Sequence, residues 1–200
     1  MRLFVAARHA QSTLNVERCV NGDPAVPVGL TEHGHEEALQ LGIQVANIPF
    51  DACFHTRFGR TRETAAIALA GRDVPFVVEP LLDDVDVGDL DGKSIDEYRA
   101  WKRAHTRADR FPGGESLDEA AARYARGWAA ILASPYALVL VVCHEIPLRY
   151  ALNGASGSRS LDGPVHELRN AAPYLFTDAQ LERAIAGIER LLADAAAPAG

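Results

Sequence analysis

Arginine and histidine side chains follow three apolar runs of this chain, in a pattern suited to phosphate chemistry. Arg8 and His9 follow the first run, Arg57 and Arg60 follow the second, and His144 follows the most apolar one. Guanidinium groups bind phosphate oxygens in bidentate fashion, and a neutral imidazole is a competent nucleophile toward phosphorus. Each of these residues alone is an ordinary surface or capping residue. Together at one edge of a sheet they would form an anion site.

The three groups converge only if the runs before them are strands of one parallel sheet, whose carboxyl ends meet at a common edge. Short apolar runs predict strands, and the helical spacing of apolar residues between them predicts helices. This alternation is typical of an α/β fold with a mostly parallel sheet. The predicted strands are residues 3–7, 50–54, 74–78, 137–142 and 174–176, with 137–142 in the centre.

Capping residues mark where the predicted helices begin. Ser94–Glu97 and Ser116–Glu119 are capping-box patterns, and Thr31 and Thr177 are expected N-caps. Helices are expected over about 31–46, 60–69, 116–133 and 147–152, and from residues 94 and 177 onward. Loops are expected over residues 16–29 and 81–92, and a polar loop or lid over 103–115.

Composition limits the class of protein. The chain has 200 residues, 48% of them hydrophobic and 24% charged, which suits a single globular domain over residues 1–200. A net charge of −7 argues against nucleic-acid binding, and no apolar run approaches the ~20 residues of a membrane span. Three widely spaced cysteines and the lack of a signal-peptide pattern predict a soluble, cytoplasmic protein.

The motifs, taken in chain order, resemble those of the histidine phosphatase superfamily, in its phosphoglycerate-mutase-like branch. The resemblance covers about residues 3–177 and implies a three-layer sandwich with a lid or insertion at roughly 84–115. The tail over residues 194–200 is expected to fray. The similar segments are Arg8–Asn15, Asp23–Gly34, Thr56–Ala65, Leu82–Gly92, Pro112–Ser116, Val142–Ile146 and Asn170–Phe176.

The resemblance implies roles for five residues. His9 is expected to be the nucleophile that forms a phosphohistidine, and Asp84 the acid that protonates the leaving oxygen. Arg8, Arg60 and His144 are expected to hold the transferred phosphoryl group. The two arginines disfavour the imidazolium form of His9 and offset charge on the phosphoryl oxygens. The chemistry therefore requires no metal and no other cofactor.

Other residues are expected at the edges of this site. Asn15 is expected to touch the substrate or its phosphate, and Arg57 either adds a phosphate contact or is only solvated. The lid is expected to decide the substrate. Its candidate contacts, each of which is otherwise a solvated side chain, are Arg103, His105, Arg107 and Arg110.

These roles predict a metal-independent phosphatase that hydrolyses a small phosphate monoester through a phosphohistidine. Two alternatives stay open: a phosphoglycerate-type phosphomutase, and a member of the family that binds a phosphorylated ligand without turning it over. The expected partner is a small phosphorylated substrate, and the expected assembly is a monomer or a homodimer.

Several residues depart from the family pattern. Ala10 replaces a glycine and brings a methyl group into a crowded turn. Glu145 and Ile146 replace two glycines, and the Glu145 carboxylate either repels phosphate or is an ordinary acidic residue of a first helical turn. The expected acid, Asp84, is shorter than the usual glutamate and has two neighbours that compete for its role, Asp83 and Asp86.

A rival interpretation is a cysteine-dependent phosphatase, because Cys143 and Arg149 have the Cys-x5-Arg spacing. Such a loop wraps backbone N–H groups around the phosphate, and Pro147 removes one of those donors. Cys143 is therefore expected to be a small buried residue.

Overall fold

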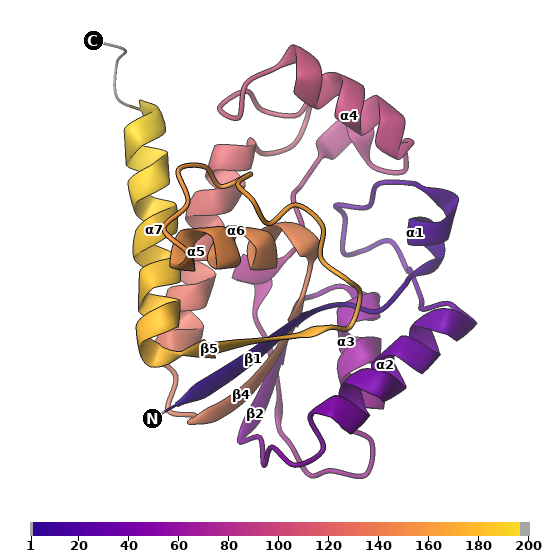
Figure 1. The fold of residues 1–200 in the computed structure, drawn as a ribbon. Coiled ribbons are helices and arrows are strands. Elements are labelled where there is room, and N and C mark those ends of the chain that lie inside the picture. Colours follow the sequence, from indigo (N-terminus) through magenta and orange to yellow (C-terminus); the bar gives the residue numbers. More distant parts are fainter. Residues whose placement is uncertain (1, 197–200) are drawn as a thin grey trace.

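A central sheet covered by helices makes up the computed structural model, which describes residues 2–196 (Figure 1). Its strands are β1 (Leu3–Arg8), β2 (Ala52–His55), β3 (Phe76–Val78), β4 (Leu138–Cys143) and β5 (Pro173–Thr177). They lie in the order β3-β2-β4-β1-β5, and only β5 runs antiparallel to its neighbour. The α/β class and the central place of β4 are confirmed.

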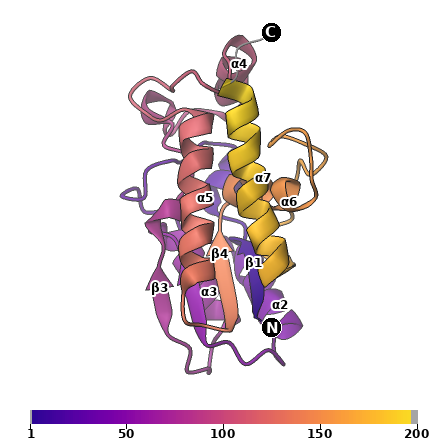
Figure 2. The ribbon, with the colours of Figure 1, turned by 90° about the vertical axis from the view of Figure 1, so that its left-hand side faces the viewer.

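Helices cover both faces of this sheet, so the fold is the expected three-layer sandwich. The α-helices of the described residues are α1 (Thr13–Glu17), α2 (Glu32–Gln44), α3 (Gly59–Ala68), α4 (Ile95–Ala104), α5 (Leu117–Ala133), α6 (Glu145–Ala155) and α7 (Asp178–Ala196). Phe4, Phe54 and Val141 pack on the side of α5, α6 and α7, and of these helices α5 and α7 face the viewer in Figure 2. Val5 and Leu140 pack on the opposite side, against α2 and α3, because alternate strand residues point to opposite faces.

Capping residues fix where the helices begin. Ser94 and Ser116 close both expected capping boxes, and the Thr31 hydroxyl accepts a backbone hydrogen bond at the start of α2. At the start of α7, Thr177 and Gln180 bond reciprocally: the Thr177 N–H donates to Gln180 Oε1 over 2.9 Å, and the Gln180 N–H donates to Thr177 Oγ1 over 3.3 Å. Each such cap stabilises its helix by about 1 kcal/mol.

Some boundaries differ from the sequence prediction. α1 overlaps the start of the expected 16–29 loop, and it forms because Ser12 and Asn15 make a capping box with asparagine in the place of glutamate or glutamine. α6 begins at Glu145 because Pro147 lies within the first helical turn, where its missing N–H needs no partner. β3 contains only three residues of the predicted 74–78 strand. α7 continues through Ala196, past the predicted start of fraying, and residues 197–200 lie outside the described part.

The 84–115 segment lies beyond the carboxyl ends of the strands and contains a short 3-10 helix, Gly88–Leu90, followed by α4. Gly88 has a φ of +52°, and a Cβ there would lie 2.1 Å from the Pro112 carbonyl oxygen. A Cβ at Gly114 would lie 2.3 Å from the Asp86 carbonyl oxygen. The Pro-Gly-Gly turn therefore packs directly on this backbone and holds α4 over the sheet edge. No helix within residues 2–196 is long and apolar enough to cross a membrane.

Candidate active site

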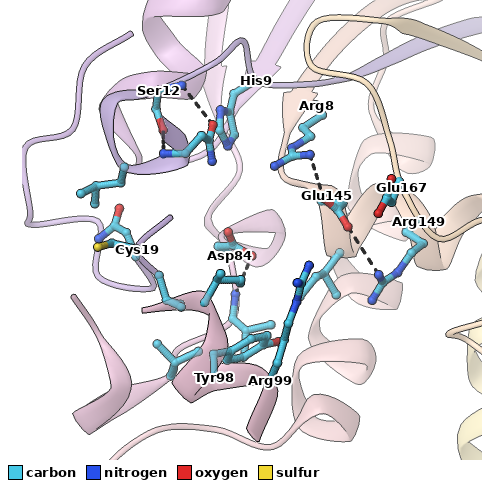
Figure 3. Close-up of a pocket in the computed structure, with 18 of the residues that line it drawn as sticks. Arg8, His9, Ser12, Cys19, Asp84, Tyr98, Arg99, Glu145, Arg149 and Glu167 are labelled. Atoms are coloured by element: carbon cyan, nitrogen blue, oxygen red, sulfur yellow. Dashed lines mark hydrogen bonds and ion pairs between the residues drawn. The ribbon is translucent and has the colours of Figure 1, made fainter. Parts of the chain in front are cut away.

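A cavity of about 500 Å³ opens at the carboxyl ends of β1 and β4, between α1, α4 and α6 (Figure 3). In the close-up, Arg8 and His9 from the end of β1, Asp84 and Glu145 all point into this space. The polar residues that line it are Arg8, His9, Ser12, Asn15, Asn21, Arg60, Asp84, Tyr98, Arg99, Lys102, Arg103, Glu145, Arg149, His166 and Glu167.

The His9 imidazole is held in one tautomer with one ring nitrogen facing the cavity. Its Nδ1–H donates to the Ala10 carbonyl oxygen over 2.8 Å, which leaves a lone pair on Nε2. The Arg60 Nε–H donates to that Nε2 atom over 3.1 Å. Burial lowers the pKa of His9 well below its ordinary value, and the charges of Arg60 and Arg8 lower it further. His9 is therefore a neutral imidazole suited to nucleophilic attack.

The backbone around His9 is fixed from two sides. The His9 N–H donates to the Cys143 carbonyl oxygen over 2.9 Å, and Asn170 Nδ2 donates to the His9 carbonyl oxygen over 2.7 Å. The Ala10 methyl group is fully buried in the apolar cluster under α2 and α3, and the Ala10 N–H donates to Thr64 Oγ1 over 3.0 Å. The turn thus accommodates the methyl group that replaces the family's glycine.

Arg60 connects the acidic and basic residues of the site. It is the second residue of α3, only 4% exposed, and its guanidinium lies 4.3 Å from the centre of the Phe58 ring. Nη2 donates to His144 Nδ1 over 3.2 Å and to Asp84 Oδ2 over 3.3 Å, while Nη1 donates to Asn21 Oδ1. Burial lowers the pKa of Arg60, and Asp84 opposes that shift.

His144 is fully buried behind His9, with the two ring centres 5.4 Å apart. Its Nε2–H donates to Thr56 Oγ1 over 2.9 Å, Thr56 donates to Thr61 Oγ1, and Thr61 donates to the Phe58 carbonyl oxygen. This chain of hydroxyl groups leaves the lone pair of His144 Nδ1 toward Arg60. Burial lowers the pKa of His144 well below its ordinary value, with a further contribution from the charge of Arg60.

Of the three neighbouring aspartates, Asp84 is the one whose carboxylate reaches this cavity. Its Oδ2 lies 3.5 Å from His144 Nδ1, and its side chain, 26% exposed, lines the cavity. Burial raises the pKa of Asp84, and Arg60 opposes that shift. Asp83 accepts hydrogen bonds from Arg57, and Asp86 accepts the Gly88 N–H over 3.0 Å, so neither one faces His9.

The structure does not bring Arg57 into the cavity. Its N–H donates to Asp83 Oδ1 over 2.9 Å, and its side chain pairs with the same carboxylate on another part of the surface. Asn15 does line the cavity, and its Oδ1 accepts the Ser12 N–H over 3.0 Å. This bond orients the Asn15 amide while its NH₂ group stays available to a ligand.

Glu145 lines the cavity and is the first residue of α6, as expected of an acidic residue in a first helical turn. Its Oε2 lies 2.8 Å from Arg8 Nη1, and its Oε1 lies 3.4 Å from Arg149 Nη1. Arg8 Nη1 also donates to the Leu168 carbonyl oxygen over 3.0 Å. The carboxylate therefore fixes one edge of the Arg8 guanidinium.

Only one of the four lid candidates, Arg103, lines the cavity. Arg107 pairs with Asp118 and Asp162, Arg110 pairs with Glu119, and the His105 ring stacks on Trp101. Two further cations that the sequence prediction missed, Arg99 and Lys102, line the cavity from the same face of α4. The helical spacing of these three residues, within a capping-box helix, was the available signal.

Three uncharged residues were also missed: Asn21, which holds Arg60, Thr56, which holds His144, and Asn170, which holds the His9 carbonyl group. Asn21 lies in the expected 16–29 loop, and Thr56 and Asn170 begin segments that match the family, but no role was expected for any of the three. Small polar residues in loops carry no periodicity that would separate them from ordinary turn residues.

The cysteine-dependent alternative does not fit this geometry. Cys143 is fully buried, its Sγ lies 3.7 Å from the His144 carbonyl oxygen, and burial raises its pKa. Arg149 pairs with Glu145 and Asp162. Among residues 2–196, no group of three or more His, Cys, Asp or Glu side chains is arranged to hold a metal ion.

Comparisons with known proteins agree with the motifs and the fold. The family model described as the histidine phosphatase superfamily (branch 1) matches residues 4–187. The 2,3-bisphosphoglycerate-dependent phosphoglycerate mutase of Bartonella quintana is 31% identical over 198 residues, covering 88% of this chain and 92% of its own length.

Two solved structures share the fold at lower identity. The alpha-ribazole phosphatase of Shigella flexneri superposes with a TM-score of 0.77 at 22% identity, over 88% of this chain and 90% of its own. The mycobacterial glucosyl-3-phosphoglycerate phosphatase superposes with a TM-score of 0.72 at 21% identity, over 88% and 93%.

Proposed function

The chain belongs to the histidine phosphatase superfamily, and on that basis we propose that it is a metal-independent phosphatase that hydrolyses a small phosphate monoester through a phosphohistidine on His9. The observation that carries the proposal is the neutral His9 imidazole, with its Nε2 lone pair 3.1 Å from a buried guanidinium nitrogen of Arg60. A phosphoryl group bound to Arg60 would lie next to that lone pair.

In the first step, the His9 Nε2 lone pair attacks phosphorus and the bond from phosphorus to the leaving oxygen breaks. Asp84 gives a proton to the leaving oxygen, and burial raises the pKa of its carboxyl group, in the direction that such a proton donor needs. Arg8, Arg60 and Asn15 donate hydrogen bonds to the phosphoryl oxygens and offset their charge.

In the second step, a water molecule attacks phosphorus and the bond from phosphorus to Nε2 breaks, which returns the electron pair to His9. The Asp84 carboxylate takes a proton from that water and is ready for the next cycle. His144 stays neutral behind the phosphoryl group, because its Nε2–H is fixed by Thr56 and its pKa is lowered by burial.

The walls of the cavity favour a substrate with a second anionic group. Within residues 2–196, Arg99, Lys102 and Arg103 make no ion pair with an acidic side chain, and all three line the cavity. Apolar side chains line the wall beside Asp84, including Val85 and Val87. The same three cations also suit a phosphomutase, which is the second candidate function, and the mutase relative supports it.

The protein is further proposed to be a single cytoplasmic domain over residues 1–200, active as a monomer or homodimer on a small soluble substrate. The net charge of −7 and the three scattered cysteines support this setting and argue against nucleic acid as a partner.

Phosphate release from a panel of monoesters, measured with EDTA present, tests the proposal. His9→Ala should abolish release, whereas His35→Ala should retain it, because His35 is a surface residue paired with Glu63. Quenching with labelled substrate should place an acid-labile label on His9. A label elsewhere, or full activity of His9→Ala, would contradict the proposal. Interconversion of 2- and 3-phosphoglycerate that outpaces phosphate release would favour the mutase.

A further inference from the structure

Arg8 lies at one end of a chain of alternating charges that leads away from the candidate site. Arg8 pairs with Glu145 over 2.8 Å, Glu145 with Arg149 over 3.4 Å, and Arg149 with Asp162 over 2.8 Å. The chain continues through an Asp162–Arg107 pair and ends with Arg107 and Asp118, which lie 2.9 Å apart. Three arginines alternate with three carboxylates, so the six groups together carry no net charge.

The charge of Arg8 is consequently balanced inside the protein before any ligand arrives. His9 and His144 are neutral, so neither supplies a positive charge to a bound phosphoryl group. Arg60 is the remaining cation that touches His9, and it also contacts Asp84. An anion on Arg8 would share this guanidinium with Glu145, and two anions on one cation repel each other.

We propose, in an inference that rests on the proposed function, that Glu145 removes one positive charge from the phosphate site. This enzyme therefore selects the singly charged form of a phosphoryl group over the doubly charged form. With the glycine of the family pattern at this position, the phosphate site would carry one more positive charge. With Glu145, a ligand with a single negative charge brings the site closer to neutral.

Other titratable and charged groups also face this position. Arg60 and Asp84 face it from the side of α3 and the 84–87 segment, and His9 faces it from the end of β1, with His144 buried behind His9. The remaining titratable or charged groups that line the cavity are Arg99, Lys102, Arg103, Arg149, which pairs with Glu145 itself, His166 and Glu167. Asp84 is the group whose titration would obscure the effect of Glu145, and Asp84→Asn keeps that side chain uncharged at every pH.

The test measures binding of inorganic phosphate by calorimetry in the Asp84→Asn protein, at about pH 5.5 and about pH 8.5, where phosphate is mostly singly and mostly doubly charged. Sulfate, which is doubly charged at both values, serves as a probe that does not titrate. The matched control is Glu182→Gln, because Glu182 is exposed on α7, does not line the cavity and makes no ion pair among the described residues.

In the parent protein, the Kd for phosphate should rise from the low to the high pH. Adding Glu145→Gln should lower the ratio of the Kd at high pH to the Kd at low pH by about tenfold. It should also tighten sulfate binding at both pH values. Adding Arg149→Gln should raise the ratio, since Glu145 then has only Arg8 as its cation. Glu182→Gln should leave the ratio unchanged.

An unchanged ratio in the Glu145→Gln protein, or a lower ratio in the Arg149→Gln protein, would overturn the inference while leaving the phosphatase proposal intact. If Glu145→Gln does not fold, the opposite shift predicted for Arg149→Gln decides the matter. If the parent protein binds neither phosphate nor sulfate, the proposed anion site is wrong, and the inference fails with it.

Discussion

Replacing Arg60 by alanine tests the arrangement of the candidate site most directly. The change removes the donor to His9 Nε2 at 3.1 Å, the donor to His144 Nδ1 at 3.2 Å and the partner of Asp84 at 3.3 Å. Truncating one member of a buried charged network lowers transition-state stabilisation by roughly 3–5 kcal/mol. Phosphate release should therefore show a kcat/KM about 10² to 10⁴ times lower.

The pH profile adds a second readout for Arg60. The charge of Arg60 lowers the pKa of His9, and only neutral His9 can attack phosphorus. Arg60→Ala should therefore move the acid limb of kcat/KM to higher pH, because His9 then takes up its proton more readily. A purely structural effect would leave this limb in place.

Arg57→Ala is the matched control, since Arg57 lies three residues earlier and its half-exposed side chain pairs with Asp83. The Arg57 side chain is exposed, and buried Asp83 keeps the hydrogen bond from the Arg57 backbone N–H when that side chain is removed. The kcat/KM should therefore fall less than about fivefold. A larger loss for Arg57→Ala than for Arg60→Ala, or an acid limb that does not move, would refute this account of the site.

Three further predictions follow from the same contacts. Asp84→Asn should slow the hydrolysis of alkyl phosphates at least about tenfold more than that of p-nitrophenyl phosphate. It should also remove the alkaline limb of the pH–activity profile, since activity needs the protonated acid. Equal losses on the two substrates would mean that another group is the acid. Thr56→Val should lower kcat by about tenfold by leaving the buried Nε2–H of His144 without an acceptor, and Thr56→Ser should restore it. Urea unfolding should show that the free energy of unfolding decreases as the pH is lowered below about 6.5. The decrease should be up to about 1.4 kcal/mol per pH unit for each of His9 and His144. The unfolded chain takes up protons that the buried imidazoles exclude, so a flat profile would show that they are charged in the fold.

The sheet edge was predictable from the sequence because it depends on local patterns. Apolar runs before His9 and His144 predicted parallel strands, and parallel strands place their carboxyl ends together. The α1 helix was not predicted, because its capping box uses Asn15 in the place of glutamate or glutamine. α6 was predicted to start two residues late because Pro147 is compatible both with a helix start and with a first turn.

The partners of the charged side chains were not predictable from the sequence. Arg8 and Glu145 are 137 positions apart, and their pairing depends on how the end of β1 faces the first turn of α6. Arg57 was considered for phosphate binding because it precedes Arg60 at a strand end, but its Asp83 partner comes from the segment after β3. The positions of charged residues along the sequence do not show where their side chains point in the fold. That orientation decides which acidic side chain pairs with which basic one.

Asp84 and Glu145, the two acidic departures from the family pattern, act on the same charge balance. An aspartate starts from a lower pKa than a glutamate, and Arg60 and Arg8 lower the pKa of Asp84 further. Burial is the largest effect that raises it, and the charge of Glu145 adds to that rise. The carboxylate that offsets Arg8 therefore also helps to keep the proton on the shorter acid. A site with aspartate at position 84 and glycine at 145 would lose that proton at lower pH, so the two departures compensate each other.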